Sequence, residues 1–313
     1  MTVLVRPLAP ADAPQAAGIN RAAFSEFFGI PDPRKFRAGA DMIEPRRRLW
    51  PEAGLALELD GELAGVALMM NWGSVCILGP ITVAPRHWSK GLARVLMAEL
   101  IALADRRGFA FTGLFTHPQS PKHIRLYESF GFRMQRIVAV MAKPASRVAE
   151  TEHVTPLSAL TPEQRALALG AIGDLTGTVH PGLDIGAECE DIVRFKLGET
   201  LLLGDASAPD GVAMCHCGPG SEASEGQMLV KFAAARGGAG APDRFRRLLG
   251  ACEAYAARKG AAQIVAGTNT GRAEAYALMQ QADYRTTMNG IAMTRPAVEG
   301  YNHPGVFAID DWR

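Results

Sequence analysis

Cysteine is scarce in this chain of 313 residues, which contains only Cys76, Cys189, Cys215, Cys217 and Cys252. An odd, widely spaced set does not form a disulfide framework, so we expect a reducing, cytoplasmic location. Neither sign of charge is in excess, because 33 basic and 32 acidic residues leave a net charge of +1. This balance argues against nucleic acid as a partner. No apolar run approaches ~18 residues and no signal-peptide pattern opens the chain, so we expect no membrane segment.

The chain length predicts two domains, and the order of elements repeats between its two halves. Each half reads as a strand, helical sequence, three strands, and then helix, strand, helix and strand. Arg106-Arg107-Gly108 corresponds to Arg258-Lys259-Gly260, and Phe132-Arg133 corresponds to Tyr284-Arg285, both at an offset of 152 residues. One shared offset across several elements indicates an internal duplication. We therefore expect an α/β (α+β) chain of two tandem domains, each a mixed, mostly antiparallel sheet flanked by helices.

The predicted boundaries place the first domain at residues 1–144 and the second at 153–297. Residues 145–152 lack an apolar period and are interpreted as a linker. Residues 298–313 form a tail that we expect to be docked, because it contains three aromatic residues: Tyr301, Phe307 and Trp312.

The segment Ile81–Arg94 has the pattern of a strand, a short polar loop and a helix. Pro85 ends the strand, and the helix is expected to open at Lys90-Gly91. The first N–H groups of a helix have no intrahelical acceptor, so they can bind a pyrophosphate. Gly91 and Ala93 are small enough to let phosphates approach the backbone. The alternative is that small residues at a helix start only permit close packing.

This segment resembles the acetyl-CoA motif of the GNAT (Gcn5-related N-acetyltransferase) superfamily, Val-x-Pro followed by Gln/Arg-x-x-Gly-x-Gly/Ala. Ser89-Lys90-Gly91-Leu92-Ala93 matches its last five positions, whereas Trp88 replaces the usual Gln or Arg. Ser120–Phe132 resembles the second family motif, a helix ending in Leu-Tyr-x-x-x-Gly-Phe. The whole chain, including the tail Tyr301–Arg313, resembles bacterial tandem members of the family.

The resemblance implies that residues 1–144 bind acetyl-CoA as cosubstrate and catalyse N-acetyl transfer. It also implies that Tyr127 points at the CoA sulfur, where a phenol can act as general acid. The residues expected to contact the cofactor are Ile81, Thr82, Val83, Trp88, Ser89, Lys90, Gly91, Leu92, Ala93, Arg94, Ser120, Lys122 and Tyr127.

The general base is left open by the sequence. His117 follows a predicted strand on the acceptor side, and its ordinary pKa of ~6.5 suits base catalysis. Glu26 lies at the end of the first predicted helix and is a second candidate. A structural role for either residue, and a water relay to bulk solvent, are alternatives. His123 is interpreted as a packing or capping residue.

The second half lacks the chemistry that the first half carries. At the shared offset, Met279 stands in place of Tyr127, and Asp243 and Phe245 stand in place of Gly91 and Ala93. We therefore expect a degenerate domain that does not bind CoA productively and that shapes the acceptor cleft. The glycine-rich segment 236–242 is interpreted as a connector.

Two further patterns are interpreted as structural. Cys215 and Cys217 point to one face of a strand and His216 to the other, so the three do not share an ion and no metal is predicted. Arg46-Arg47-Arg48 is interpreted as a solvated charge run, with contact to CoA or to an acidic substrate as the alternative. It lies at the end of a segment, Phe28–Arg48, that is expected to be mobile over a site.

The sequence thus favours an acetyl-CoA-dependent N-acetyltransferase that acts on a primary amine. The alternative from another class is a non-catalytic acyl-CoA-binding regulatory module. The acceptor, a small-molecule or peptide amine, carries no recognisable code, and a monomer or a homodimer is expected.

Overall fold

The computed structural model describes residues 2–145 and 154–313, which we call the N-terminal half and the C-terminal half. Apart from residue 145, the predicted linker lies outside the described residues. All strands join one 13-stranded sheet that runs through both halves. The strand order along the sheet is β1-β2-β3-β4-β5-β12-β6-β11-β10-β9-β8-β7, and β13 pairs with β10 beside this path.

The N-terminal half follows the predicted element order. Its elements are β1 Val3–Pro7, α1 Ala13–Phe28, α2 Glu44–Leu49, β2 Gly54–Leu59, β3 Glu62–Trp72, β4 Val75–Val83, α3 Leu92–Arg107, β5 Phe111–Thr116, α4 Pro121–Glu128 and β6 Arg133–Pro144.

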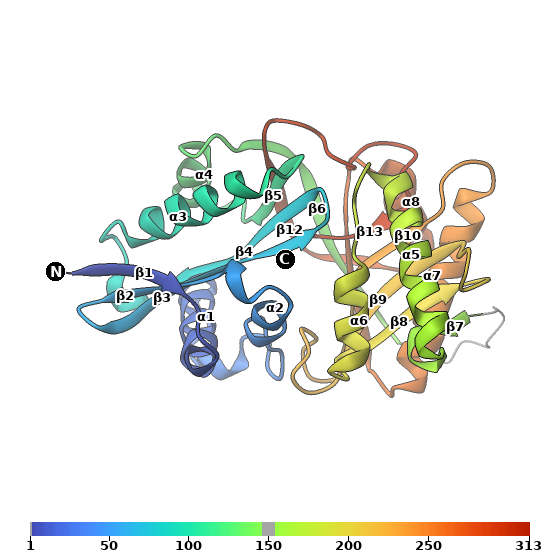
Figure 1. Cartoon of the computed structure of the whole chain (residues 1–313), viewed down its shortest axis with the longest axis horizontal. Helices are drawn as coiled ribbons and strands as arrows, with labels where there is room; N and C mark the ends of the chain where they lie inside the picture. The colour runs from blue at the N-terminus through green and yellow to red at the C-terminus, as the bar shows by residue number, and fades with distance from the viewer. Residues whose placement is uncertain (1, 146–153) are drawn as a thin grey trace.

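Alternation along β2 decides which helices cover which face of the sheet. Leu55 and Leu57 share a buried cluster with α3, whereas Ala56 between them belongs to a cluster with α1. Successive side chains of a strand point to opposite faces, so each face is covered by its own helices. Figure 1 shows α3 and α4 above the sheet and α1 and α2 below it.

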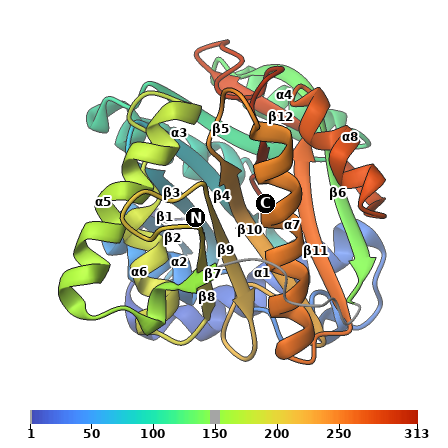
Figure 2. The same cartoon turned by 90° about the vertical axis from the view of Figure 1, so that its right-hand side faces the viewer.

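The C-terminal half repeats this architecture. Its elements are β7 Val154–Pro156, α5 Pro162–Val179, α6 Gly186–Arg194, β8 Gly198–Leu203, β9 Gly211–Cys217, β10 Gln227–Ala235, α7 Ala241–Arg258, β11 Gln263–Asn269, α8 Ala273–Gln281, β12 Arg285–Arg295 and β13 Ala308–Ile309. Leu201 and Leu203 pack into a cluster with α7 and α8, and Leu202 packs toward α5 and α6. Figure 2 shows these helices around the strands of this half.

The 152-residue offset recurs in the folded elements. β5 and β11 start 152 residues apart, and so do α4 and α8, and β6 and β12. Phe132 and Tyr284, which occupy equivalent positions, are both fully buried. The two halves are therefore structural repeats as well as sequence repeats.

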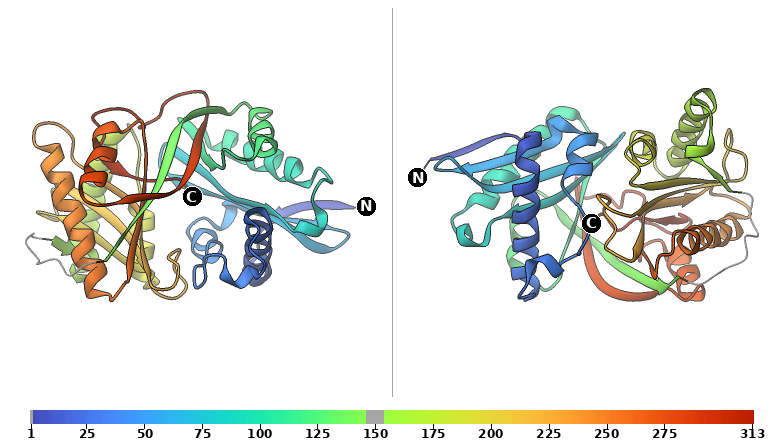
Figure 3. Two further views of the ribbon diagram at one scale, coloured as in Figure 1. Left: turned by 180° about the vertical axis from the view of Figure 1, so that it is seen from behind. Right: turned by 90° about the horizontal axis from the view of Figure 1, so that it is seen from below.

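Strand β12 of the C-terminal half completes the sheet of the N-terminal half. β12 lies between β5 and β6, antiparallel to both, and β6 in turn pairs with β11. Figure 3 shows these long strands crossing between the two halves. Gly290 of β12 passes so close to Phe115 of β5 that a Cβ there would lie 1.9 Å from the ring. A sheet shared in this way joins the halves through backbone hydrogen bonds.

The tail after β12 is folded back between the halves, where the C-terminus lies in Figure 1. β13 adds to β10, and Tyr301 and Trp312 are buried against Phe111 of β5. Trp312 also lies against Gly113, whose added Cβ would come within 2.8 Å of the indole. The tail therefore packs on strands from both halves.

Two helices were not predicted. α2 begins within the segment Phe28–Arg48, which was expected to be mobile over a site, and α6 follows the long helix α5. The two helices have only six and nine residues, so no long apolar period marks them in the sequence. Within residues 2–145 and 154–313, no helix combines the length and apolar character needed to cross a bilayer.

Candidate active-site cleft

A cavity of about 1440 Å³ lies between the start of α3, the segment Phe24–Met42 and the strands of the C-terminal half. All the predicted cofactor-contact residues except Lys90 line it. Its other walls include Val140 of β6, Leu229 of β10 and Val265 of β11. The cleft is therefore built by both halves, around the loop that the sequence singles out.

The loop before α3 presents a row of unused backbone donors. Gly91 is the N-cap in a left-handed conformation, with φ of 78°. Among the described residues, no acceptor is recorded for the N–H groups of residues 89–93, whereas the next N–H, that of Arg94, bonds to the Gly91 carbonyl at 3.0 Å. A Cβ at Gly91 would meet no protein atom within 4 Å, so the space above the loop is open. Such a row of donors at a helix N-terminus is suited to a pyrophosphate.

Trp88 is fixed by the backbone of β4. Its indole N–H donates to the Val83 carbonyl at 2.7 Å, and its ring is one of the exposed large apolar groups. The tryptophan that departs from the family pattern therefore holds the loop against the strand end.

Strands β4 and β5 separate at the cavity. They pair in parallel from Val75 to Leu78, and β4 then continues to Val83 paired only with β3 on its other side. On its other edge β5 pairs with β12 from Thr112 to Thr116. The free edge of Ile81–Val83 lines the cavity, and the Thr82 hydroxyl is buried there with no hydrogen-bond partner among the described residues. This opening can hold an extended ligand arm beside the strand.

Tyr127 lies on α4 across the cavity and is half-buried. Its ring contacts Phe132 edge-on at 6.4 Å, and burial raises the pKa of its phenol to about 12. Arg94 stacks on Phe130 at 5.6 Å, while Ser120 and Lys122 complete this side of the cavity. The phenol thus stays protonated at neutral pH and can donate a hydrogen bond into the cleft.

His117 reaches the cavity but lies within aromatic rings. Phe28, Phe27 and Phe115 are 5.0–5.2 Å from its imidazole. Burial, with smaller contributions from His123 and Arg313, lowers the pKa of His117 to about 4. The imidazole is neutral at pH 7. As a base it is about 6 pKa units weaker than an alkylamine at ~10.4, so it cannot readily deprotonate an ammonium group.

The two remaining polar candidates differ in position. His123 lines the cavity beside Phe27, and burial lowers its pKa as well. Glu26 is exposed on α1 and is not among the residues that line the cavity.

Residues 18–132, which carry the loop and Tyr127, match the sequence model of the acetyltransferase (GNAT) family. This segment is a GNAT acetyltransferase domain.

Solved structures with the same fold extend the GNAT likeness over nearly the whole chain. A putative acetyltransferase from Pyrococcus horikoshii matches with a TM-score of 0.69 and 16% identity, covering 99% of this chain and 95% of that one. A GCN5-related N-acetyltransferase from Sphaerobacter thermophilus matches with a TM-score of 0.61 and 18% identity, over 94% and 95% of the two chains. A tandem GNAT protein from the clavulanic acid biosynthesis pathway gives 0.58 and 11%, over 94% and 98%. The chain therefore has the tandem GNAT fold.

The equivalent helix start in the C-terminal half keeps a shorter row of free donors. The predicted equivalence of Gly91 with Asp243 is wrong in structural terms, because α7 begins earlier and Gly240 is its left-handed N-cap, with φ of 78°. Counted from the two N-caps, Ala241 and Pro242 take the places of Leu92 and Ala93. The Ala241 N–H bonds to the Gly238 carbonyl and Pro242 has no N–H, whereas the N–H groups of residues 238–240 have no acceptor among the described residues. The Arg244 side chain also covers the loop, donating to the Arg236 and Gly237 carbonyls.

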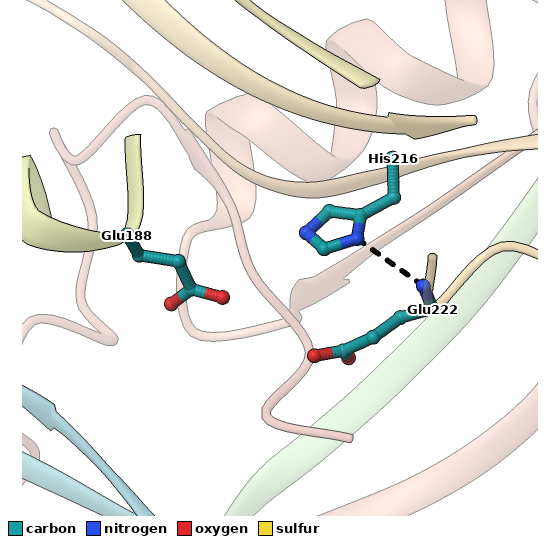
Figure 4. A group of neighbouring side chains, drawn as sticks. All are labelled: Glu188, His216 and Glu222. Atoms are coloured by element: carbon teal, nitrogen blue, oxygen red, sulfur yellow. Dashed lines mark hydrogen bonds between the residues drawn. The ribbon is translucent and has the colours of Figure 1, made fainter. Parts of the chain in front are cut away.

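A buried charge network joins the two halves beneath the cleft. Glu188, His216 and Glu222 face one another, with potential ligand atoms within 4.8 Å (Figure 4). The ammonium of Lys231 bonds to both carboxylates, so a protein cation already holds the position that an ion would take. The backbone N–H of Glu222 donates to His216 Nδ1 at 3.2 Å. This arrangement is an ion-pair network that Lys231 neutralises.

Arg46 extends this network to α2, so its interpretation as part of a solvated run is wrong. Its guanidinium is 2% exposed and pairs with Glu222 at 2.6 Å. It also donates to the Gly79 and Arg313 backbone oxygens, at 2.8 and 2.5 Å. Arg47 is buried against Glu44, and only Arg48 is largely exposed. The partners of Arg46 are remote in sequence, which is why a charge run in the sequence did not reveal them.

Proposed function

We propose that this protein is an acetyl-CoA-dependent N-acetyltransferase whose reaction takes place in the cleft of the N-terminal half. The observation that carries the proposal is the row of unbonded N–H groups at residues 89–93, which lies on the same cavity as Tyr127. The row is suited to the pyrophosphate, and the open edge of Ile81–Val83 is suited to the pantetheine arm. Tyr127 is then placed on the path toward the thioester sulfur.

The reaction needs little acid–base chemistry from the protein if the amine enters neutral. The amine nitrogen attacks the thioester carbonyl carbon, and its N–H proton is lost as the carbon–sulfur bond breaks. That proton balances the one gained by the thiolate, and the Tyr127 phenol can relay it by donating to sulfur and recovering a proton from nitrogen. A phenol with a pKa near 12 cannot give up a net proton easily, so its main contribution is a hydrogen bond to the leaving thiolate.

We assign a different role to the C-terminal half. At its helix start the Ala241 N–H is bonded, Pro242 has no N–H and the Arg244 side chain covers the loop, which supports the view that it does not bind CoA productively. Its strands and the loop that contains Ala223–Glu225 instead form the far wall of the cavity. We infer that this half shapes the acceptor site. A CoA titration should therefore saturate at one site per chain, and two equivalent sites would contradict this assignment.

Two glycines of α3 allow a matched test of the pyrophosphate site. Gly91 and Gly108 cap opposite ends of the helix with φ of 78° and 68°, and an added Cβ would meet no protein atom at either position. Replacing either by Ala costs a similar backbone strain of about 1 kcal/mol. Only Gly91→Ala should weaken acetyl-CoA binding, by about tenfold or more. Equal Kd values for the two variants would remove the loop from the site.

The catalytic assignment is tested with Tyr127→Phe and the control Tyr276→Phe, on a tyrosine of α8 outside the cavity lining. CoA release with a panel of amines should fall about 10²- to 10³-fold for Tyr127→Phe, with acetyl-CoA affinity retained. Tight acetyl-CoA binding without turnover of any amine would instead favour the non-catalytic binding module. The observation that favours this second function is the low pKa of His117, which makes its imidazole a weak base.

A further inference from the structure

Arg37 stands on the wall of the cavity contributed by the segment between α1 and α2. Its backbone is in the left-handed region, with φ of 44°, which few non-glycine residues adopt. The C-terminal half holds it there: the guanidinium donates to the Glu222 carbonyl at 2.7 Å, and the Glu225 N–H donates to the Ala38 carbonyl at 2.7 Å. Contacts with the C-terminal half therefore hold Arg37 in a costly backbone conformation, and such conformations are typical of functional positions.

The guanidinium of Arg37 lacks an anionic partner among the described residues. Its neighbour Arg46 is paired with Glu222, and Arg313 is paired with Asp311, whereas Arg37 forms no ion pair. Burial, and then repulsion by Arg313, lowers the pKa of Arg37 to about 10, so it remains a cation at pH 7. A desolvated cation on a cavity wall is stabilised by an anion that enters the cavity.

An apolar surface runs from Arg37 toward the reacting centre. Phe36, the adjacent residue, stacks on Phe24 at 5.3 Å and on Phe28 at 5.9 Å. Phe28 in turn contacts His117 at 5.0 Å. These side chains line the cavity together with Met42 and Met288. A ligand held by Arg37 can therefore pack a large apolar group on this surface.

Two polar atoms on the same wall lack a partner among the described residues. They are Asn20 Oδ1 and His117 Nδ1, on side chains that are 3% and 8% exposed. Both residues line the cavity. Buried acceptors without partners are costly, and an amine N–H can satisfy either of them.

We propose that the acceptor is a free amino acid with a large apolar side chain, whose carboxylate binds Arg37 and whose side chain packs on Phe24, Phe28 and Phe36. Its amino group and carboxylate share one carbon, so the amino group lies close to Arg37, and Asn20, which lines the same small pocket as Arg37, can accept a hydrogen bond from it. This assignment rests on the proposed acetyl transfer and names its substrate class. It accounts for one cation, one apolar surface and an unpaired acceptor in a single ligand.

The test compares phenylalanine, phenylalanine amide and phenethylamine as acceptors for the intact protein, measured as CoA release. We expect kcat/KM to be about 10- to 100-fold higher for phenylalanine than for the two compounds without a carboxylate. Arg37→Gln should bring this ratio close to one. The control Arg34→Gln removes an exposed cation that is paired with Asp32 outside the cavity, and should leave the ratio unchanged. Equal rates for the three acceptors in the wild-type protein would overturn the proposal.

A second measurement does not require turnover. Binding of 3-phenylpropanoate should exceed that of 3-phenylpropanol by about tenfold or more in calorimetry of the wild-type protein, and Arg37→Asn should abolish the difference. Asparagine tolerates the left-handed conformation, so this variant limits the damage to folding. Equal binding of acid and alcohol overturns the anion site. Preferential binding of the acid without acetyl transfer to any amine supports the site while contradicting the proposed function.

Discussion

Replacing Lys231 by methionine should destabilise the protein strongly, because this ammonium balances two buried carboxylates. Lys231 is 7% exposed and bonds to Glu188 and Glu222, while Arg46 supplies the second positive charge. Lys231→Met leaves the network with one uncompensated negative charge. Breaking a buried pair costs about 3–5 kcal/mol. An entropy of unfolding of about 2.1 cal/mol/K per residue then converts this cost, over the 313 residues, into a Tm lower by about 5–8 °C.

A double-mutant cycle separates the charge effect from lost packing. Glu188→Gln with Lys231→Met restores neutrality and keeps an oxygen acceptor for the Trp72 indole, which donates to Glu188 at 2.8 Å. The double variant should therefore recover much of the stability that Lys231→Met loses. Arg285→Met, in an exposed pair with Asp283, serves as the control and should cost less than about 1 kcal/mol.

The assay is urea unfolding followed by tryptophan fluorescence, together with a thermal scan. If Lys231→Met costs no more than the Arg285→Met control, the network does not hold the two halves together. A double variant that is less stable than either single variant would likewise refute the argument from charge balance.

Three further outcomes are expected. Gly290→Val should lower the free energy of unfolding by about 1–3 kcal/mol, because the added side chain meets Phe115, and Phe115→Ala should relieve the loss. An unchanged free energy of unfolding in Gly290→Val contradicts the packing argument. Burial lowers the pKa of His216 to about 4, so the contribution of the neutral imidazole to folding stability is present above pH 6.5 and is lost as the pH falls toward 4. The advantage in unfolding free energy of the wild-type protein over His216→Asn should shrink by about 3 kcal/mol in that window. A difference that stays constant with pH would refute this expectation. The pKa of Tyr127, near 12, predicts no alkaline loss of activity below pH 10, and a falling limb that Tyr127→Phe abolishes would contradict this.

The sequence by itself determined the features that depend on residues close together in the chain. The strand, loop and helix of Ile81–Arg94 follow from an apolar run, a proline and a glycine within a few residues of one another. The duplication was visible because one offset relates the starts of β5 and β11 and of α4 and α8. The same offset failed at the start of α7, because α7 has 18 residues where α3 has 16, which moves the helix cap toward the N-terminus without altering the helix's apolar period.

Only the tertiary structure decided how the halves combine and what the cleft presents to an acceptor. A strand pattern shows which residues alternate but not which neighbour they pair with, so the insertion of β12 between β5 and β6 was invisible in the sequence. Likewise, Arg37 and Arg46 appear in the sequence as two cations among several. Only the approach of Glu222, more than 170 residues away, leaves one of them paired and the other free to bind an anion.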